Sequence, residues 1–108
     1  MRPSGASDPS VLVLASLAER PRHGYAITAD VREMAGVRLG PGTLYGVLAR
    51  LEDRGLIEAL PSDDRRKPYR LTGDGARVLE EELRAQERVA HTGLSRLASS
   101  RLAAEGSA

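Results

Sequence analysis

Apolar residues in the first half of the chain recur every three or four positions, which is the period of helices that bury one face. The spacing predicts helices over about residues 10–19, 24–35 and 41–54. Gly36 and Gly55 stand where the second and third helices end. Each is expected to adopt the left-handed backbone conformation that closes a helix.

After Gly55 the pattern changes from helix to strand. Residues 56–60 read as a short strand, residues 61–67 as a turn rich in Asp and Arg, and residues 69–71 as a second strand. The pattern therefore predicts a two-stranded β-hairpin directly after the third helix. Two helices joined by a short connection containing Gly are typical of a helix-turn-helix, and a hairpin after them is typical of the wing of a winged helix.

A long helical stripe begins near Thr72, the predicted N-cap residue. Its members advance by three or four positions and are Leu79, Leu83, Gln86, Ala90, Leu94 and Leu97. A lone helix of this length has no core of its own. The stripe is therefore expected to pack against the domain or against another chain.

These patterns divide the chain into four parts. We predict a mobile tail over residues 1–7, a winged helix-turn-helix domain over 8–71, a long helix over 72–102 and a frayed end over 103–108. The expected fold class is mainly α with a small β-hairpin.

Composition removes several classes of function. The length of 108 residues leaves room for one small domain, and the absence of Cys excludes disulfides, thiolate metal sites and a cysteine nucleophile. His23 and His91 lie far apart in the sequence, so we expect neither a metal site nor a cofactor. No nucleophile and base stand at a recognisable spacing, so we do not expect an enzyme.

The sequence has no pattern typical of a membrane protein. The longest apolar run, residues 11–15, is far shorter than the roughly 20 residues that span a bilayer. The amino end has no basic segment followed by an apolar core of signal length. We therefore expect a cytoplasmic protein that makes no contact with a membrane.

The net charge of +1 indicates no partner, but the placement of the charges does. Fifteen of the sixteen basic residues are Arg, which GC-rich codons explain at least as well as phosphate binding does. Residues 65–70 carry four cations at the tip of the predicted hairpin, partly offset by Asp63 and Asp64. Such a run is often only a solvated surface, yet a basic wing after a helix-turn-helix favours nucleic-acid binding.

The third predicted helix contains the other candidate site. Its apolar face leaves five residues directed outward, namely Thr43, Tyr45, Gly46, Ala49 and Arg50. The small residues allow close approach to a surface, the polar ones offer donors to phosphates or base edges, and the helix N-terminus presents backbone N–H groups. The alternative is that residues 40–42 only form a turn and Tyr45 only packs, and the periodicity does not choose between the two.

Three segments in this order resemble the PadR family of transcriptional regulators. They read LASLAERPRHGY over residues 14–25, LGPGTLYGVLARLEDRGLIE over 39–58 and RRKPYRLTGDG over 65–75. The resemblance covers about residues 11–83, and the short carboxyl end is similar to the subfamily with a single terminal helix. It implies a bacterial, homodimeric winged-helix repressor whose third helix enters the major groove of DNA and whose last helix is the dimerisation arm.

Carried over to this sequence, the resemblance assigns roles to two sets of residues. The DNA-binding set is Pro41, Gly42, Thr43, Tyr45, Gly46, Arg50, Arg65, Arg66 and Lys67. The dimer-interface set is Leu79, Leu83, Gln86, Ala90, Leu94 and Leu97. The sequence departs from the family at Gly40, where Ser is common and would cap the helix, and at Gly46 and Pro68, which leaves the choice of operator open.

The resemblance also implies an operator with ATGT/ACAT-like arms in an inverted repeat, and it places His23 at a helix start in a structural role. Some members sense metals or aromatic compounds, so a small-molecule effector at the dimer interface is a further expectation, although the stripe contains no aromatic residue. The alternative function is a winged-helix module that binds proteins without specific DNA binding.

Overall fold

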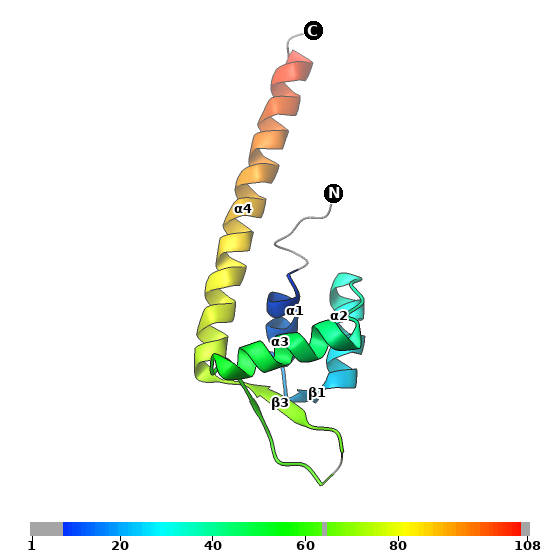
Figure 1. Cartoon of the computed structure of the whole chain (residues 1–108). Helices are drawn as coiled ribbons and strands as arrows, with labels where there is room; N and C mark the ends of the chain where they lie inside the picture. Colours follow the sequence, from blue (N-terminus) through cyan, green and yellow to red (C-terminus); the bar gives the residue numbers. More distant parts are fainter. Residues whose placement is uncertain (1–7, 64, 107–108) are drawn as a thin grey trace.

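The computed structural model describes residues 8–63 and 65–106, which form four helices and a three-stranded antiparallel sheet (Figure 1). In chain order the elements are α1 (Pro9–Leu17), β1 (Arg22–His23), α2 (Gly24–Ala35), α3 (Pro41–Asp53), β2 (Ile57–Ala59), β3 (Pro68–Leu71) and α4 (Gly73–Gly106). The predicted winged-helix architecture, mainly α with a hairpin and a long last helix, is confirmed.

The sheet has one strand more than the predicted hairpin. β1 pairs with β3, so that the strand order is β1-β3-β2 and the second strand of the hairpin lies in the centre of the sheet. Arg22 lies opposite Tyr69, and His23 lies opposite Pro68. The sequence analysis missed β1 because two residues are too few to produce an alternating pattern.

The predicted helices are confirmed, and their ends differ by a few residues. α1 ends at Leu17 rather than at residue 19. Gly36 and Gly55 follow α2 and α3 with φ angles of 67° and 73°, the left-handed conformation predicted for them. α4 continues to Gly106, so residues 103–106 are helical rather than frayed.

The predicted tail over residues 1–7 lies outside the described residues, as do residues 107 and 108. The division of the chain at residues 71, 72 and 102 stays a prediction.

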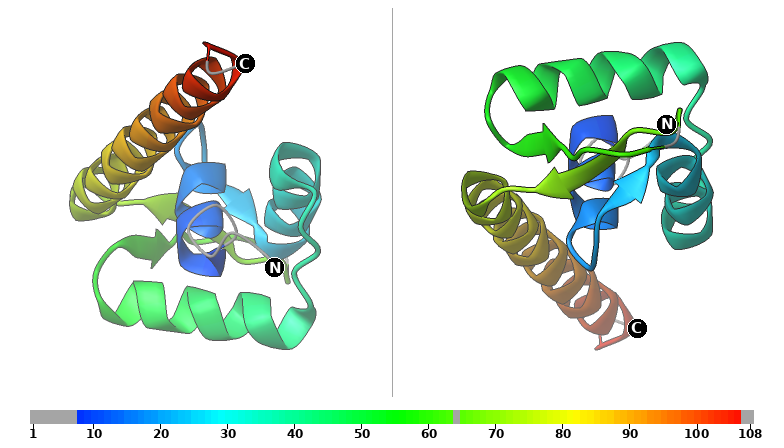
Figure 2. Two further views of the ribbon diagram at one scale, coloured as in Figure 1. Left: turned by 90° about the horizontal axis from the view of Figure 1, so that it is seen from above. Right: turned by 90° about the horizontal axis from the view of Figure 1, so that it is seen from below.

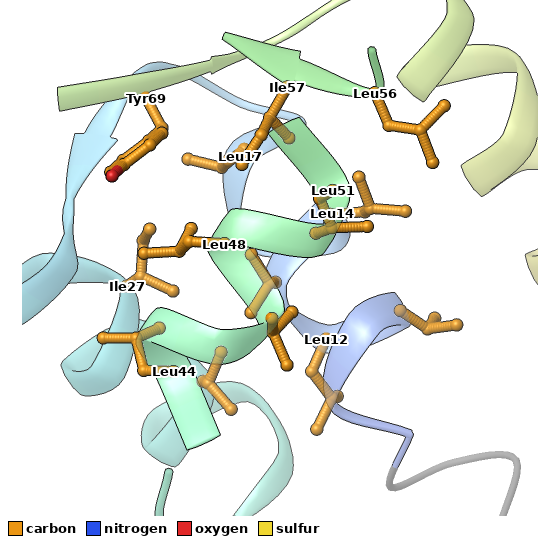
Figure 3. Close-up of a cluster of buried hydrophobic side chains, with 14 of the residues drawn as sticks. Leu12, Leu14, Leu17, Ile27, Leu44, Leu48, Leu51, Leu56, Ile57 and Tyr69 are labelled. Atoms are coloured by element: carbon orange, nitrogen blue, oxygen red, sulfur yellow. The ribbon is translucent and has the colours of Figure 1, made fainter. Parts of the chain in front are cut away.

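α1 lies in the middle of the molecule, with α2 and α4 on either side of it and α3 across one end (Figure 2). Its side chains are buried on nearly all sides rather than on one face. Side chains from α1, α2, α3 and the sheet meet there in one core, which includes Leu14, Ile27, Leu48, Ile57 and Tyr69 (Figure 3).

Arg22 connects the start of the sheet to the first two helices. Its Nε donates a hydrogen bond of 2.9 Å to the Ser16 carbonyl oxygen, and its Nη2 lies 3.0 Å from a Glu19 carboxylate oxygen and 3.8 Å from Asp30. The side chain is 13% exposed, so the guanidinium is paired in a partly desolvated place. These contacts hold β1 against the end of α1 and against α2.

The turn before α4 fixes the direction in which this helix leaves the domain. Thr72 Oγ1 accepts a hydrogen bond of 3.0 Å from the Gly75 N–H, which confirms the predicted N-cap. The same hydroxyl donates to the Gly55 carbonyl oxygen at 2.7 Å, and the Thr72 N–H donates to the Leu56 carbonyl oxygen at 3.1 Å. The start of α4 is thereby attached to the turn that ends α3.

Candidate nucleic-acid interface

α3 lies on the surface with one buried and one exposed face. Leu44, Val47, Leu48 and Leu51 are buried in the core. Four of the five residues predicted to face outward, Thr43, Tyr45, Ala49 and Arg50, are exposed, and the fifth, Gly46, is half-buried. Pro41 and Gly42, which the resemblance adds to the DNA-binding set, are exposed as well. α3 therefore presents its predicted set to solvent on the side that the core does not use.

The start of α3 is open in the way that its sequence predicts. Gly40 is the N-cap residue and makes no side-chain hydrogen bond to the helix, and Pro41 occupies the first turn. The amide groups of this turn carry the positive end of the helix dipole, which attracts anions such as phosphates.

A cleft of about 510 Å³ joins α3 to the hairpin. It is lined by Tyr45 of α3, by the hairpin cations Arg65, Arg66 and Lys67, by Tyr69 of β3, and by His23, Gly24 and Tyr25 at the start of α2. We call it the wing cleft. The structure thus brings together Tyr45 and three cations that the sequence separates by some twenty positions.

Arg70, the fourth cation of residues 65–70, does not line the wing cleft. The Arg70 guanidinium forms an ion pair with the Glu58 carboxylate on the neighbouring strand β2, and these two residues are register partners in the sheet. Since the ion pair offsets its charge, the count of four cations at the hairpin tip overstated the positive charge there. The wing cleft contains three cations.

Four residues that line the wing cleft, His23, Gly24, Tyr25 and Tyr69, were not in the predicted DNA-binding set. Tyr25 is 78% exposed, and its ring stacks on that of His23 with 6.5 Å between centroids. His23 Nδ1 accepts a hydrogen bond of 3.3 Å from the Ala26 N–H and caps α2, so the structural role predicted for this ring is confirmed. The sequence HGY at residues 23–25, part of the first segment that resembles the family, was the available signal, but only the pairing of β1 with β3 brings these residues beside the hairpin.

Gly24 is another of these residues, and it allows α2 and α3 to meet. A Cβ atom at this position would lie 3.2 Å from Tyr45 Oη and 3.3 Å from Leu44 Cδ2, which is tighter than ordinary packing. A glycine here therefore lets the Tyr45 side chain lie against the start of α2, which orients its ring toward the wing cleft.

Tyr69 forms part of the wall of the cleft and part of the core. Burial raises the pKa of its hydroxyl above 10.0, and the Glu52 carboxylate and Tyr45 act in the same direction. The residue therefore stays neutral at physiological pH, and the charge of the wing cleft comes from its cations.

The predicted dimer-interface residues differ in exposure. Leu83, Leu94 and Leu97 are 42%, 68% and 54% exposed, Ala90 is exposed and Gln86 is half-buried. We call these five residues the arm stripe. Leu79 is 5% exposed and belongs to the core of its own chain, because α4 still lies against α1 at this height. The assignment of Leu79 to the dimer interface stays a prediction.

Two properties of residues 8–63 and 65–106 bear on other functions. These residues contain no group of three or more His, Cys, Asp or Glu side chains that could hold a metal ion. None of their helices is long and apolar enough to cross a membrane. The effector predicted at the dimer interface stays a prediction.

Comparison with known proteins identifies relatives of this chain. Residues 13–81 match the model of the PadR-like family of transcriptional regulators. The chain is 40% identical over 81 residues to transcriptional regulator Rv3488 of Mycobacterium tuberculosis, and the match covers 72% of this chain and 75% of that protein. It is 46% identical over 83 residues to an uncharacterised 37.1 kDa protein of transposon Tn4556 from Streptomyces fradiae, covering 77% of this chain but 24% of that protein.

A solved structure has the same fold. The PadR family transcriptional regulator from Eggerthella lenta is 36% identical to this chain, with a TM-score of 0.67, and the match covers 82% of this chain and 79% of that one.

Proposed function

The chain belongs to the PadR-like family of transcriptional regulators, and on this premise we propose that it is a homodimeric repressor that binds an inverted-repeat DNA operator. Each copy inserts α3 into the major groove of one half-site, and the hairpin between β2 and β3 lies along the adjacent phosphate backbone. Pro41, Gly42, Thr43, Tyr45, Gly46 and Arg50 contact the groove. Arg65, Arg66 and Lys67 contact phosphates.

The wing cleft is the observation that carries this proposal. Tyr45, on the exposed face of α3, and three cations of the hairpin line the same hollow. A recognition helix reads base edges, and cations beside it neutralise phosphates and release counterions, so the two halves of a DNA interface lie next to each other here. A hairpin that was only a solvated surface would have no need to place its cations beside the exposed face of α3.

The homodimer is supported by the exposed arm stripe. α4 has 34 residues, and Leu83, Leu94 and Leu97 stand on one of its faces with large exposed fractions. An apolar face on a helix that projects from its domain favours a second helix as partner. A two-fold dimer in turn matches an operator whose two arms are inverted copies.

The wing is tested by a gel-shift titration on a duplex with ATGT and ACAT arms. The variant Arg65→Ala, Arg66→Ala, Lys67→Ala removes three cations, and we expect it to bind DNA more weakly. The slope of log affinity against log salt concentration should become less steep, by up to about three. The control Arg77→Ala, Arg84→Ala, Arg88→Ala removes the same charge from α4, where Arg77 and Arg84 pair with Asp74 and Glu87.

The control should bind with nearly the parent slope. An unchanged slope in the wing variant would remove the hairpin from the interface. If the parent protein enriches no inverted repeat from a library of random duplexes, the proposal of a repressor is wrong. The alternative, a winged-helix module that binds proteins, then takes its place.

A further inference from the structure

The middle of the exposed face of α3 carries almost no side chain. At about 3.6 residues per turn, the positions opposite the buried face are Gly42, Gly46 and Ala49. Tyr45 and Arg50 lie on either side of them. A Cβ atom at Gly42 would meet nothing within 4 Å. A surface that meets α3 at this face can therefore come close to the helix backbone.

The guanidinium of Arg50 lies over Gly46. A Cβ atom at position 46 would be 3.5 Å from Arg50 Nη1. A helical side chain points back toward the amino end of its helix and covers the preceding turn, as Arg50 does here. Since Gly46 has no side chain, the guanidinium reaches the middle of the exposed face, although its own Cα atom lies toward the edge of that face.

The Arg50 guanidinium has no carboxylate partner within residues 8–63 and 65–106. Ion pairs in these ranges are formed by other arginines, namely Arg22, Arg70, Arg77 and Arg84. Asp53 stands three positions after Arg50, a spacing at which ion pairs form on helices, but these two described residues form none. Arg50 is exposed, so its donors are available to a ligand that meets α3.

The place of a donor on a helix in the major groove decides which part of DNA it meets. The middle of the exposed face is directed at the floor of the groove, where the base edges lie, whereas the flanks face the sugar-phosphate backbone. The cations of the hairpin line the wing cleft at the side of α3, next to Tyr45. The guanidinium over Gly46 instead stands where base edges come within reach.

Resting on the entry of α3 into the major groove proposed above, we propose that Arg50 reads one guanine in each half-site of the operator. Two N–H groups of its planar guanidinium donate to O6 and N7 of that base, the two acceptors that guanine presents in the major groove. Adenine presents an amino donor in place of O6, which repels the guanidinium. Gly46 is a positioning residue, because it leaves free the place that the guanidinium occupies.

Gly46 thereby determines part of the choice of operator. It is one of the positions at which this chain departs from the family that it resembles. A methyl group at position 46 fits at ordinary contact distance from Arg50, but a larger side chain would take the place of the guanidinium and turn it aside. The residue at position 46 therefore sets where Arg50 meets DNA, and with it the base that is read there.

Selection from a library of random duplexes tests the reading of guanine. The parent protein should enrich an inverted repeat with guanine at one position of each half-site. Arg50→Ala should enrich the same repeat with that position open to other bases, whereas the loss of a phosphate contact weakens binding to all sequences about equally. Arg54→Ala is the matched control, since it removes a cation at the C-cap of the same helix, and it should keep the guanine.

Gly46 is tested with two substitutions of different size. Gly46→Ala adds only the methyl group that fits beside Arg50 Nη1 and should keep the preference for guanine. Gly46→Leu fills the place of the guanidinium without changing the charge, and we expect the preference at that one position to fall by about tenfold. An unchanged preference in Gly46→Leu would overturn the positioning role of Gly46.

A base analogue tests the same contact without any change in the protein. Replacing the selected guanine by 7-deazaguanine exchanges N7 for a C–H group and keeps the base pair. The parent protein should lose about tenfold in affinity, and Arg50→Ala should lose nothing further on the same duplex. Equal losses by the two proteins would assign N7 to another residue and overturn the proposal.

The selection also separates this proposal from the proposed function. A parent protein that enriches no inverted repeat would overturn both. An inverted repeat whose base preferences are the same for the parent protein and for Arg50→Ala would overturn the reading of guanine by Arg50 and leave the repressor intact.

Discussion

Gly75, in the first turn of α4, lies directly against the backbone of Leu56. A Cβ atom at position 75 would overlap the Leu56 carbonyl oxygen and lie 2.9 Å from Leu71 Cδ1. The same carbonyl oxygen accepts the hydrogen bond from the Thr72 N–H. This close approach sets the angle between α4 and the DNA-binding part of the chain.

Gly75→Ala is therefore expected to destabilise the fold. The backbone of Leu56 cannot move without breaking its hydrogen bond to Thr72, so we expect a loss of about 3 kcal/mol in the free energy of unfolding. Urea titration followed by circular dichroism measures it. Gly73→Ala, two residues earlier and with nothing within 4 Å of the added carbon, should change stability by less than about 0.5 kcal/mol. Equal effects of the two variants would contradict the close packing.

Tyr45→Ala should weaken operator binding without unfolding the protein. The side chain is 59% exposed, so its loss costs little packing, but it removes a donor at the edge of the wing cleft. We expect a loss of about tenfold to a hundredfold in affinity, the usual range for one direct contact. Met34→Ala is the control, since Met34 is a large side chain that is 48% exposed and lies near the end of α2.

Thermal melting of both variants should give midpoints near that of the parent protein. Operator affinity that survives Tyr45→Ala would remove this residue from the interface.

Ser16→Ala is expected to stabilise the protein. The Ser16 side chain is 1% exposed, and within the described part of the chain its hydroxyl has no hydrogen-bond partner. Removing a buried unsatisfied hydroxyl recovers its desolvation cost, so we expect a gain of about 1 kcal/mol in urea unfolding. Ser99→Ala on the exposed surface of α4 measures the gain from helix propensity alone and should be smaller. A loss of stability in Ser16→Ala would mean that the hydroxyl is bonded.

The free energy of unfolding should fall in alkaline solution, partly because the Tyr69 hydroxyl loses its proton. Its pKa is raised in the folded state, so the folded protein holds the hydroxyl proton more tightly than the unfolded chain. This contribution is fully present below the unfolded value near 10.0 and is lost as the pH rises through the folded value. Urea unfolding between pH 8 and 11 measures it.

Tyr69→Phe should flatten that decline, whereas Tyr25→Phe, which removes an exposed hydroxyl, should follow the parent curve. Parallel curves for the parent and Tyr69→Phe would contradict the role of burial at Tyr69.

Local features of this protein were predictable from its residues. The helices, the left-handed glycines at 36 and 55 and the Thr72 cap depend on side chains within a few positions of each other, and the structure has them where the patterns predict. The three segments at residues 14–25, 39–58 and 65–75 also sufficed to suggest the PadR family, which the family match over residues 13–81 confirms. The exposed residues of α3 followed from helical period, because burying one face leaves the other free.

Contacts between distant segments were not predictable in the same way. β1 is a strand only because Arg22 and His23 find a partner in β3, and Leu79 is buried only because α4 leaves the domain beside α1. Arg70 is neutralised by Glu58 across a sheet register that no single segment contains. The spacing of apolar residues predicts which face of a segment is apolar. Which other segment covers that face depends on how all the helices and strands pack together.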